Sequence, residues 1–102
     1  MTRARKPSKR SDTRPLARTL IVASRFLADL EYWLESEWRI ALRIVRLMRE
    51  VARDPLHGIA KPEPLKHDLA GSWSRRIDQE HRLLYQVDDE AIQFVSARFH
   101  YE

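Results

Sequence analysis

Residues 24–53 read SRFLADLEYWLESEWRIALRIVRLMREVAR, and their apolar side chains recur at three- and four-residue spacing. That spacing is the period of an amphipathic helix, so the stretch predicts two consecutive helices over residues 24–35 and 36–53. Ser24 and Ser36 stand at the two starts, where a serine hydroxyl commonly caps free backbone N–H groups. The stretch decides the fold, because each helix must bury its apolar face against another layer.

The second helix has two unlike sides. Its apolar residues fill one arc of a helical wheel, and five arginines occupy the opposite arc. Trp38 and Leu42 lie off the apolar arc, so we expect them to contact something other than the core. Asp54-Pro55 ends the helix, because proline disfavours the α conformation in the residue before it. The arginines are Arg39, Arg43, Arg46, Arg49 and Arg53.

Patterns typical of strands flank the helices. A short β-branched run at residues 19–23 precedes them, and Gly71 and Asp88-Asp89 punctuate the chain that follows. The later runs of strand character are residues 64–69, 72–78, 82–87 and 91–99. This order predicts an α+β domain, with two N-terminal helices packed on one face of a mainly antiparallel sheet of four to five strands.

Alternation along the last two runs predicts which side chains share a face of the sheet. The set expected to face the helices is Leu83, Tyr85, Val87, Val95, Ala97 and Phe99. The set expected on the open face is Arg82, Leu84, Gln86, Phe94, Ser96, Arg98 and His100. A cation, Arg82, and a titratable ring, His100, would then lie on the same exposed surface.

Length and composition exclude several classes of protein. The 102 residues, 43% of them hydrophobic, suit one domain with a single modest core. The sequence has no cysteine, which excludes disulfides and thiolate metal sites. No apolar run approaches the roughly 20 residues that span a bilayer. We therefore expect a cytoplasmic protein without a membrane partner.

The first 18 residues differ from the rest in charge and composition. They carry seven basic side chains against Asp12 alone, a net charge of +6, whereas residues 19–102 carry 12 basic and 14 acidic side chains. Because they hold few apolar residues and two prolines, we expect residues 1–18 to be a disordered basic arm and residues 19–102 to be the folded domain. The arm is either a solvated extension or a weak, nonspecific attractor of RNA.

The C-terminal half holds side chains that suit metal-free RNA cleavage. Such cleavage needs a base for the ribose 2′-OH, cations for the charge on the phosphorane, and an acid for the leaving 5′-oxygen. Glu63 lies between two prolines that stiffen the backbone, and His100 shares the expected open face with Arg82. Taken singly, each of these residues is more often an ordinary surface side chain. The further phosphate-binding candidates are Lys66 and Arg76.

Four sequence motifs follow one another along the second half of the chain. They are Lys61-Pro62-Glu63-Pro64-Leu65-Lys66-His67, Trp73-Ser74-Arg75-Arg76-Ile77, Glu80-His81-Arg82-Leu83 and His100-Tyr101. Together they resemble the YoeB (Txe) toxins of the RelE superfamily, and the resemblance covers residues 19–101. It implies the RelE-like toxin fold and an endoribonuclease that cuts mRNA in the ribosomal A site. The implied products are a 2′,3′-cyclic phosphate and a 5′-hydroxyl.

The resemblance also implies roles for individual residues. Glu63 matches the general base on the 2′-OH, His100 the general acid, and Arg82 the cation that stabilises the transition-state phosphate. Neither a metal nor a cofactor is implied. The residues matched to RNA positioning are Lys66, Arg76 and Tyr101.

The implied partners are mRNA on the ribosome and a YefM-like antitoxin, with operator DNA bound only through the toxin–antitoxin complex. The oligomeric state stays open, a homodimer included. One rival function is a catalytically silent toxin homologue that acts as an antitoxin-binding and operator-binding corepressor, and the presence of Glu63, Arg82 and His100 together argues against it. A second rival, a nonspecific RNA-binding protein that uses the arm, is disfavoured by the acidic balance of the domain.

Overall fold

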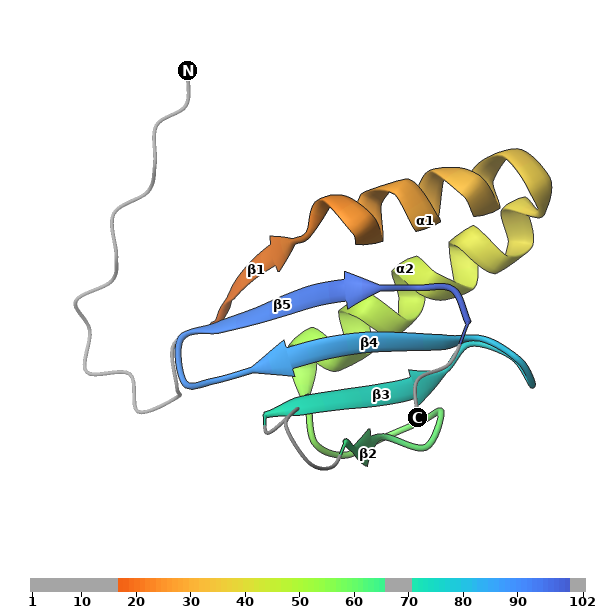
Figure 1. The fold of residues 1–102 in the computed structure, drawn as a ribbon. Coiled ribbons are helices and arrows are strands. Elements are labelled where there is room, and N and C mark those ends of the chain that lie inside the picture. Colours follow the sequence, from red (N-terminus) through yellow and green to blue (C-terminus); the bar gives the residue numbers. More distant parts are fainter. Residues whose placement is uncertain (1–16, 66–70, 100–102) are drawn as a thin grey trace, which may run out of the picture.

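The computed structural model describes residues 17–65 and 71–99, in which two helices pack on one face of a five-stranded sheet (Figure 1). The predicted α+β class, with both helices on one side of a mainly antiparallel sheet, is confirmed. In chain order the elements are β1 (Thr19–Val22), α1 (Ser24–Ser36), α2 (Trp38–Arg53), β2 (Glu63–Pro64), β3 (Ser72–Arg76), β4 (Arg82–Val87) and β5 (Ala91–Ser96).

The strand order is β1-β5-β4-β3-β2, so the first strand of the chain lies beside the last one. β1 and β5 run parallel, with Thr19 opposite Ala91, while the other neighbouring pairs are antiparallel. Parallel neighbours need a long crossover connection, which here comprises both helices and three strands. β4 has its predicted bounds, whereas β3 and β5 end earlier than predicted, and most of the strand expected over residues 64–69 lies outside the described residues.

Both helices form where the apolar period predicts them, but the predicted serine caps are wrong. Ala23 occupies the N-cap position of α1, and its N–H donates to the carbonyl of Phe94, so the helix begins directly where strand pairing ends. Ser36 belongs to the last turn of α1, where its hydroxyl donates to the Tyr32 carbonyl at 2.7 Å. Glu37 is the single residue between the helices. Neither helix is both long and apolar enough to cross a membrane.

The core lies between the helices and the inner face of the sheet. Three aromatic rings meet at its centre, because Phe94 packs against Phe26 with ring centroids 5.5 Å apart and against Tyr85 at 6.4 Å. All three side chains are fully buried, and such burial of apolar surface is the main force that holds the two layers together. The other core residues are Trp33, Ala41, Ile44, Leu47, Val51, Ile77, Leu83, Ile92 and Ala97.

A β-bulge in β5 overturns part of the predicted alternation. Tyr85 pairs with Phe94, but the preceding residue of β4, Leu84, pairs with Ser96, which leaves Val95 as an extra residue. The prediction that Phe94 faces the open side is therefore wrong, since this ring belongs to the core. Beyond the bulge the alternation is restored, so Ser96 points to the open side with Leu84 as predicted.

The basic arm touches the domain at its last residue. Arg18 donates a hydrogen bond from Nε to the carbonyl oxygen of Asp88, at 2.7 Å, in the turn between β4 and β5. Residues 1–16 lie outside the described residues, so the disorder of the arm stays a prediction.

Candidate active site on the open sheet face

The face of the sheet that the helices leave uncovered carries most of the polar candidates. Strand register places Glu63 opposite Ser74, and Ser74 opposite Leu84, on this side. Arg76, two residues after Ser74, shares the same side. Strand pairing therefore brings β2, β3 and β4 together so that one acidic side chain, Glu63, and two basic ones, Arg76 and Arg82, share a surface.

Arg76 and Arg82 are direct cross-strand partners on this face. Side chains opposite each other on neighbouring strands lie close together, and like charges in that position repel. Within residues 17–65 and 71–99 neither guanidinium forms an ion pair. The Arg82 guanidinium donates, among these residues, only to the carbonyls of Asp78 and His81, both at 3.3 Å. The pair concentrates positive charge that a bound anion would relieve.

Glu63 lies on β2, at the edge of the sheet, with an exposed side chain. Its partner Ser74 is two residues from Arg76, so the carboxylate and that guanidinium are diagonal neighbours. The backbone on either side is fixed, because Leu65 N–H donates to the Ser72 carbonyl at 2.8 Å and Arg76 N–H to the Ala60 carbonyl at 2.9 Å. Glu63, Arg76 and Arg82 are thus the predicted site residues that the structure brings to one surface.

The loop that leads to Glu63 has a strained backbone. Ala60 and Lys61 have φ values of 67° and 52°, a left-handed conformation that side chains other than glycine seldom adopt. Each such residue costs roughly 1–3 kcal/mol and persists only where its surroundings hold it. The bond from Arg76 N–H to the Ala60 carbonyl is one such restraint, so strain and restraint occur directly before the proposed base.

Arg75 supplies the other restraint on this loop. Its fully buried guanidinium donates to the carbonyls of Asp54, His57 and Ile59, at 2.5, 2.9 and 3.3 Å. It also donates to the Tyr85 hydroxyl at 3.2 Å, which in turn donates to the Pro55 carbonyl. Burial raises the pKa of Tyr85, although the neighbouring guanidinium opposes that shift.

Arg75 was not singled out from the sequence as a site residue. It binds carbonyls because the C-terminal end of α2 and the loop after it present several at once. A signal was available in the sequence, since alternation puts Arg75 between Trp73 and Ile77 on the core side. Gly58 also fits this arrangement, because a Cβ there would lie 3.3 Å from Nη1 of Arg75.

The remaining predicted site residues are Lys66, His100 and Tyr101, and all three lie outside the described residues. Phe99 is the last described residue before His100, and its carbonyl accepts a hydrogen bond from the Arg82 N–H at 2.8 Å. Among the described residues, no group of three histidine, cysteine, aspartate or glutamate side chains could hold a metal ion.

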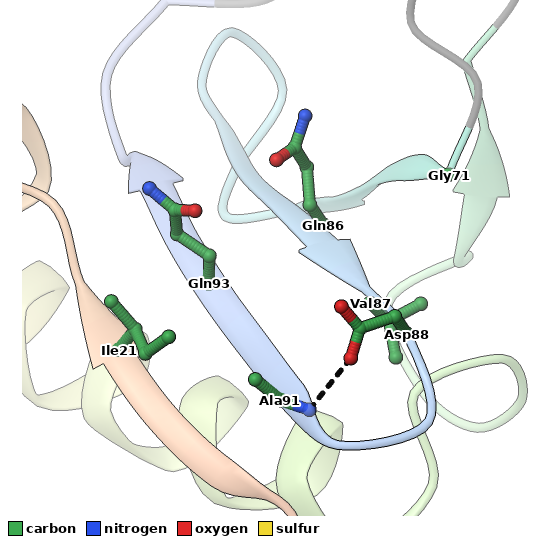
Figure 2. A pocket seen from close by; sticks show the side chains of 7 residues that line it. All are labelled: Ile21, Gly71, Gln86, Val87, Asp88, Ala91 and Gln93. Atoms are coloured by element: carbon green, nitrogen blue, oxygen red, sulfur yellow. Dashed lines mark hydrogen bonds between the residues drawn. The ribbon is translucent and has the colours of Figure 1, made fainter.

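The other end of the same face holds a hollow of about 270 Å³, shown in Figure 2. Two amides, Gln86 and Gln93, point from β4 and β5 to the same side. The Asp88 carboxylate accepts hydrogen bonds from the N–H groups of Glu90 and Ala91 within the turn, and these hydrogen bonds lower its pKa. The hollow therefore presents amides but no free acid or base. Its lining is Ile21, Gly71, Gln86, Val87, Asp88, Ala91 and Gln93.

The fold is similar to that of several bacterial toxins whose structures have been solved. The YoeB/ParE toxin from Agrobacterium tumefaciens gives a TM-score of 0.76 at 39% identity, and the match covers 81% of this chain and 99% of that one. Two Staphylococcus aureus structures match at 36% identity over 84% of this chain and 100% of theirs: a YoeB dimer, with a TM-score of 0.76, and a YoeB–YefM complex, with 0.72. The protein therefore has the fold of the RelE-like toxins.

Sequence comparison narrows this class to one family. The family described as YoeB-like toxin of bacterial type II toxin-antitoxin system matches residues 23–101. The toxin YoeB of Streptomyces coelicolor is 52% identical over 73 residues, which cover 72% of this chain and 87% of that toxin. The Escherichia coli toxin YoeB is 48% identical with the same coverage of both chains. The chain belongs to the YoeB family, as a toxin of a type II toxin–antitoxin system.

Proposed function

We propose that this toxin is an endoribonuclease that cleaves mRNA in the ribosomal A site, in the cytoplasm, and uses no metal or other cofactor. The observation that carries the proposal is the facing pair Arg76 and Arg82 beside the exposed carboxylate of Glu63. Two arginines without an acidic partner among the described residues suit a substrate that brings its own negative charge, as an RNA phosphate does.

In the proposed reaction, the ribose 2′-OH attacks the neighbouring phosphorus, and the bond from phosphorus to the 5′-oxygen of the next nucleotide breaks. Glu63 takes the proton of the 2′-OH, and His100 gives a proton to the leaving 5′-oxygen, so the protons balance. Arg82 stabilises the charge that develops on the phosphorane. The products are a 2′,3′-cyclic phosphate and a 5′-hydroxyl, and Lys66, Arg76 and Tyr101 position the RNA.

Two features of the backbone support this assignment. The restrained, left-handed residues before Glu63 limit how its carboxylate can move, and a base must be held close to the proton that it removes. The hydrogen bond between Arg82 and Phe99 connects the phosphate-binding strand to the residue that precedes His100. Both features favour one site built from β2, the start of β4 and the end of the chain.

We further propose that a YefM-like antitoxin neutralises the toxin by binding along α2. An apolar groove of about 290 Å³ runs between α1 and α2. Beside it, a second hollow of about 320 Å³ includes three arginines of α2, and the Arg39 guanidinium lies 4.7 Å from the centre of the Trp38 ring. Apolar anchors next to cations suit an acidic, amphipathic peptide segment. The groove is lined by Leu30, Leu34, Trp38, Ala41, Leu42 and Val45.

The S. aureus YoeB whose structure was solved with YefM supports such a partner, and its dimer supports homodimer formation as a second mode of assembly. Operator DNA would then be bound through the antitoxin of the complex. A catalytically silent homologue would make the same protein contacts, so only cleavage separates it from the proposed enzyme.

The decisive experiment is translation of a defined mRNA with purified ribosomes, followed by mapping of the new 5′ ends. We expect cleavage at a codon in the A site that leaves a 5′-hydroxyl and continues in excess chelator. An mRNA with a single 2′-deoxy sugar at the scissile position should resist cleavage, because it lacks the attacking group. Full cleavage of the deoxy substrate would exclude the mechanism, and no cleavage of either RNA would leave the corepressor function in its place.

A further inference from the structure

The backbone of Phe99 is held on both of its polar groups by two consecutive residues. Its N–H donates to Nδ1 of His81 at 2.7 Å, and its carbonyl accepts from the N–H of Arg82 at 2.8 Å. Phe99 has a φ of 64°, the left-handed region that a bulky residue rarely occupies. The two hydrogen bonds are the restraint that such a conformation requires.

Ala97, two residues earlier, is held in the same way by α1. Its N–H donates to Oδ2 of Asp29 at 2.8 Å, and its carbonyl accepts from Nε1 of Trp33 at 2.9 Å. Asp29 and Trp33 are one helical turn apart and are only 4% and 7% exposed. The segment after β5 therefore has four backbone groups fixed, two by α1 and two by the start of β4.

The imidazole of His81 lies between the two anchoring regions. Its ring centroid is 4.9 Å from that of Trp33 and 5.8 Å from that of Phe99, and its side chain is 12% exposed. A backbone N–H can only donate, so Nδ1 must carry a lone pair, and the ring proton of neutral His81 must reside on Nε2. Nε2 is 3.7 Å from the Glu80 carboxylate, which favours that tautomer.

We propose that His81 is a positioning residue whose Nδ1 fixes Phe99 in its left-handed conformation and so sets the direction in which the chain leaves Phe99 toward His100. The inference rests on the proposed function, in which His100 is the general acid. His81 itself touches no reacting atom. It acts through one backbone hydrogen bond to the Phe99 N–H, and Arg82, the next residue, binds the carbonyl of Phe99 and so links it to the strand that carries the proposed phosphate-binding guanidinium.

The test compares His81→Phe with His81→Asn. Phenylalanine keeps a ring between Trp33 and Phe99 but offers no acceptor, whereas an asparagine carbonyl can accept from the Phe99 N–H in place of Nδ1. We expect His81→Phe to lower kcat for cleavage of A-site mRNA by about 10- to 100-fold, with KM little changed, and His81→Asn to recover much of that loss. The matched control is His57→Phe, because that side chain is 78% exposed and should tolerate the change.

A second measurement does not depend on activity. In the ¹⁵N-labelled protein, the ring nitrogens of His81 should show Nδ1 as the unprotonated one, and the Phe99 amide should exchange slowly with solvent, more slowly than in His81→Phe. A toxin that cleaves no RNA yet shows these signals would overturn only the proposed function. A Phe99 amide equally protected in His81→Phe, or a parental kcat in that variant, would overturn the role of His81.

Discussion

Arg75 and Arg76 are neighbours in β3, yet strand alternation sends their side chains to opposite faces and gives them different tasks. Arg75 is buried and binds the backbone of the loop before Glu63. Arg76 faces Arg82 on the open side, where no acidic partner among the described residues neutralises the pair. A change at Arg75 should therefore act through the fold, and a change at Arg82 through its proposed contact with an RNA phosphate.

We predict that Glu63→Ala and Arg82→Ala each slow the cleavage of A-site mRNA by roughly 100-fold or more, because a general base and a charge-stabilising group commonly contribute that much. His100→Gln should slow it similarly, since an amide can hydrogen-bond to the 5′-oxygen but cannot protonate it. The measurement is single-turnover cleavage, with the melting temperature of each variant recorded and His57→Ala as the control. A folded Glu63→Ala protein that cleaves at the parental rate would remove Glu63 as the base.

We predict that Tyr85 makes the fold sensitive to alkali. Its pKa is raised above the usual 10.0 by burial, so the folded state keeps the phenol proton more firmly than the unfolded state does. The stability from Tyr85 is therefore fully present below about pH 10, and it is lost as the pH rises through the folded pKa. Tyr85→Phe should flatten this alkaline loss while lowering stability near pH 7 by about 1 kcal/mol through its missing hydrogen bonds. Urea unfolding at pH 7 and above pH 10 would detect both effects, and an unchanged alkaline slope would contradict the assignment.

Residue-level prediction from sequence succeeded where alternation alone was sufficient. It placed Arg82 on the open face, where the strand register also brings Glu63 and Arg76, while the catalytic and RNA-binding roles of these residues stay predictions. It missed Asp29, because a polar residue in an amphipathic helix gives no sign that its carboxylate binds the backbone of Ala97, which lies 68 positions later. Long-range hydrogen bonds of a side chain to a backbone group leave no periodic signal in the sequence.

The two helices bury only part of their apolar side chains. Leu27 and Leu34 on α1, and Trp38, Leu42 and Val45 on α2, are each at least 39% exposed. All of these except Leu27 line the groove between the two helices, and apolar side chains gathered around a groove are a common feature of protein interfaces. The expectation that Trp38 and Leu42 lie away from the core is confirmed.

We predict that Trp38→Ala combined with Leu42→Ala weakens binding of the cognate antitoxin by at least about 100-fold, because buried aromatic and aliphatic anchors commonly dominate interface energy. Cleavage of A-site mRNA should stay within about twofold of the parent, since the groove lies on α1 and α2 rather than on the open sheet face. Titration calorimetry with the purified antitoxin measures the first effect. Parental affinity in the double variant would place the interface elsewhere.

Strands β4 and β5 also show where alternation in the sequence is insufficient to predict which face of the sheet a side chain lies on. The bounds of β4 were predicted correctly because its alternation is unbroken. In β5 the bulge at Val95 shifts the alternation by one position, so that Ile92 and Phe94 before it and Ala97 after it all belong to the core. The prediction continued a single unbroken alternation from Ala97 back through the bulge, so Phe94 was assigned to the wrong face.

On the scale of the whole molecule, the positive charge of the chain belongs to its arm rather than to its domain. We predict that deleting residues 1–16 leaves the melting temperature and A-site cleavage nearly unchanged, because Arg18 and its bond to the β4–β5 turn are retained. Nonspecific binding to single-stranded RNA should weaken and depend less on salt, since six basic side chains are removed. A filter-binding series between 50 and 300 mM salt tests this. A fall of several degrees in melting temperature would show that the arm packs on the domain.

The two-layer fold could be predicted from the hydrophobic periodicity of the sequence, but the pairing of β1 with β5 could not. Nothing local in Thr19–Val22 says that this strand pairs in parallel with Ala91–Ser96, because the choice depends on the whole chain between them. The hydrogen bonds between the first and last strands therefore join residues about seventy positions apart. Long-range pairings of this kind slow folding, since a large loop must close before they form.

That pairing has a consequence for the point in its synthesis at which the chain can complete its fold. During synthesis, β1 emerges early and remains without its neighbour until β5 is made, and the Ala97 and Phe99 anchors are later still. An incomplete chain that lacked β5 would leave β1 without its neighbour and would also lack the Ala97 and Phe99 anchors. We therefore expect the domain to complete its fold only after β5 and the residues that follow it have been made.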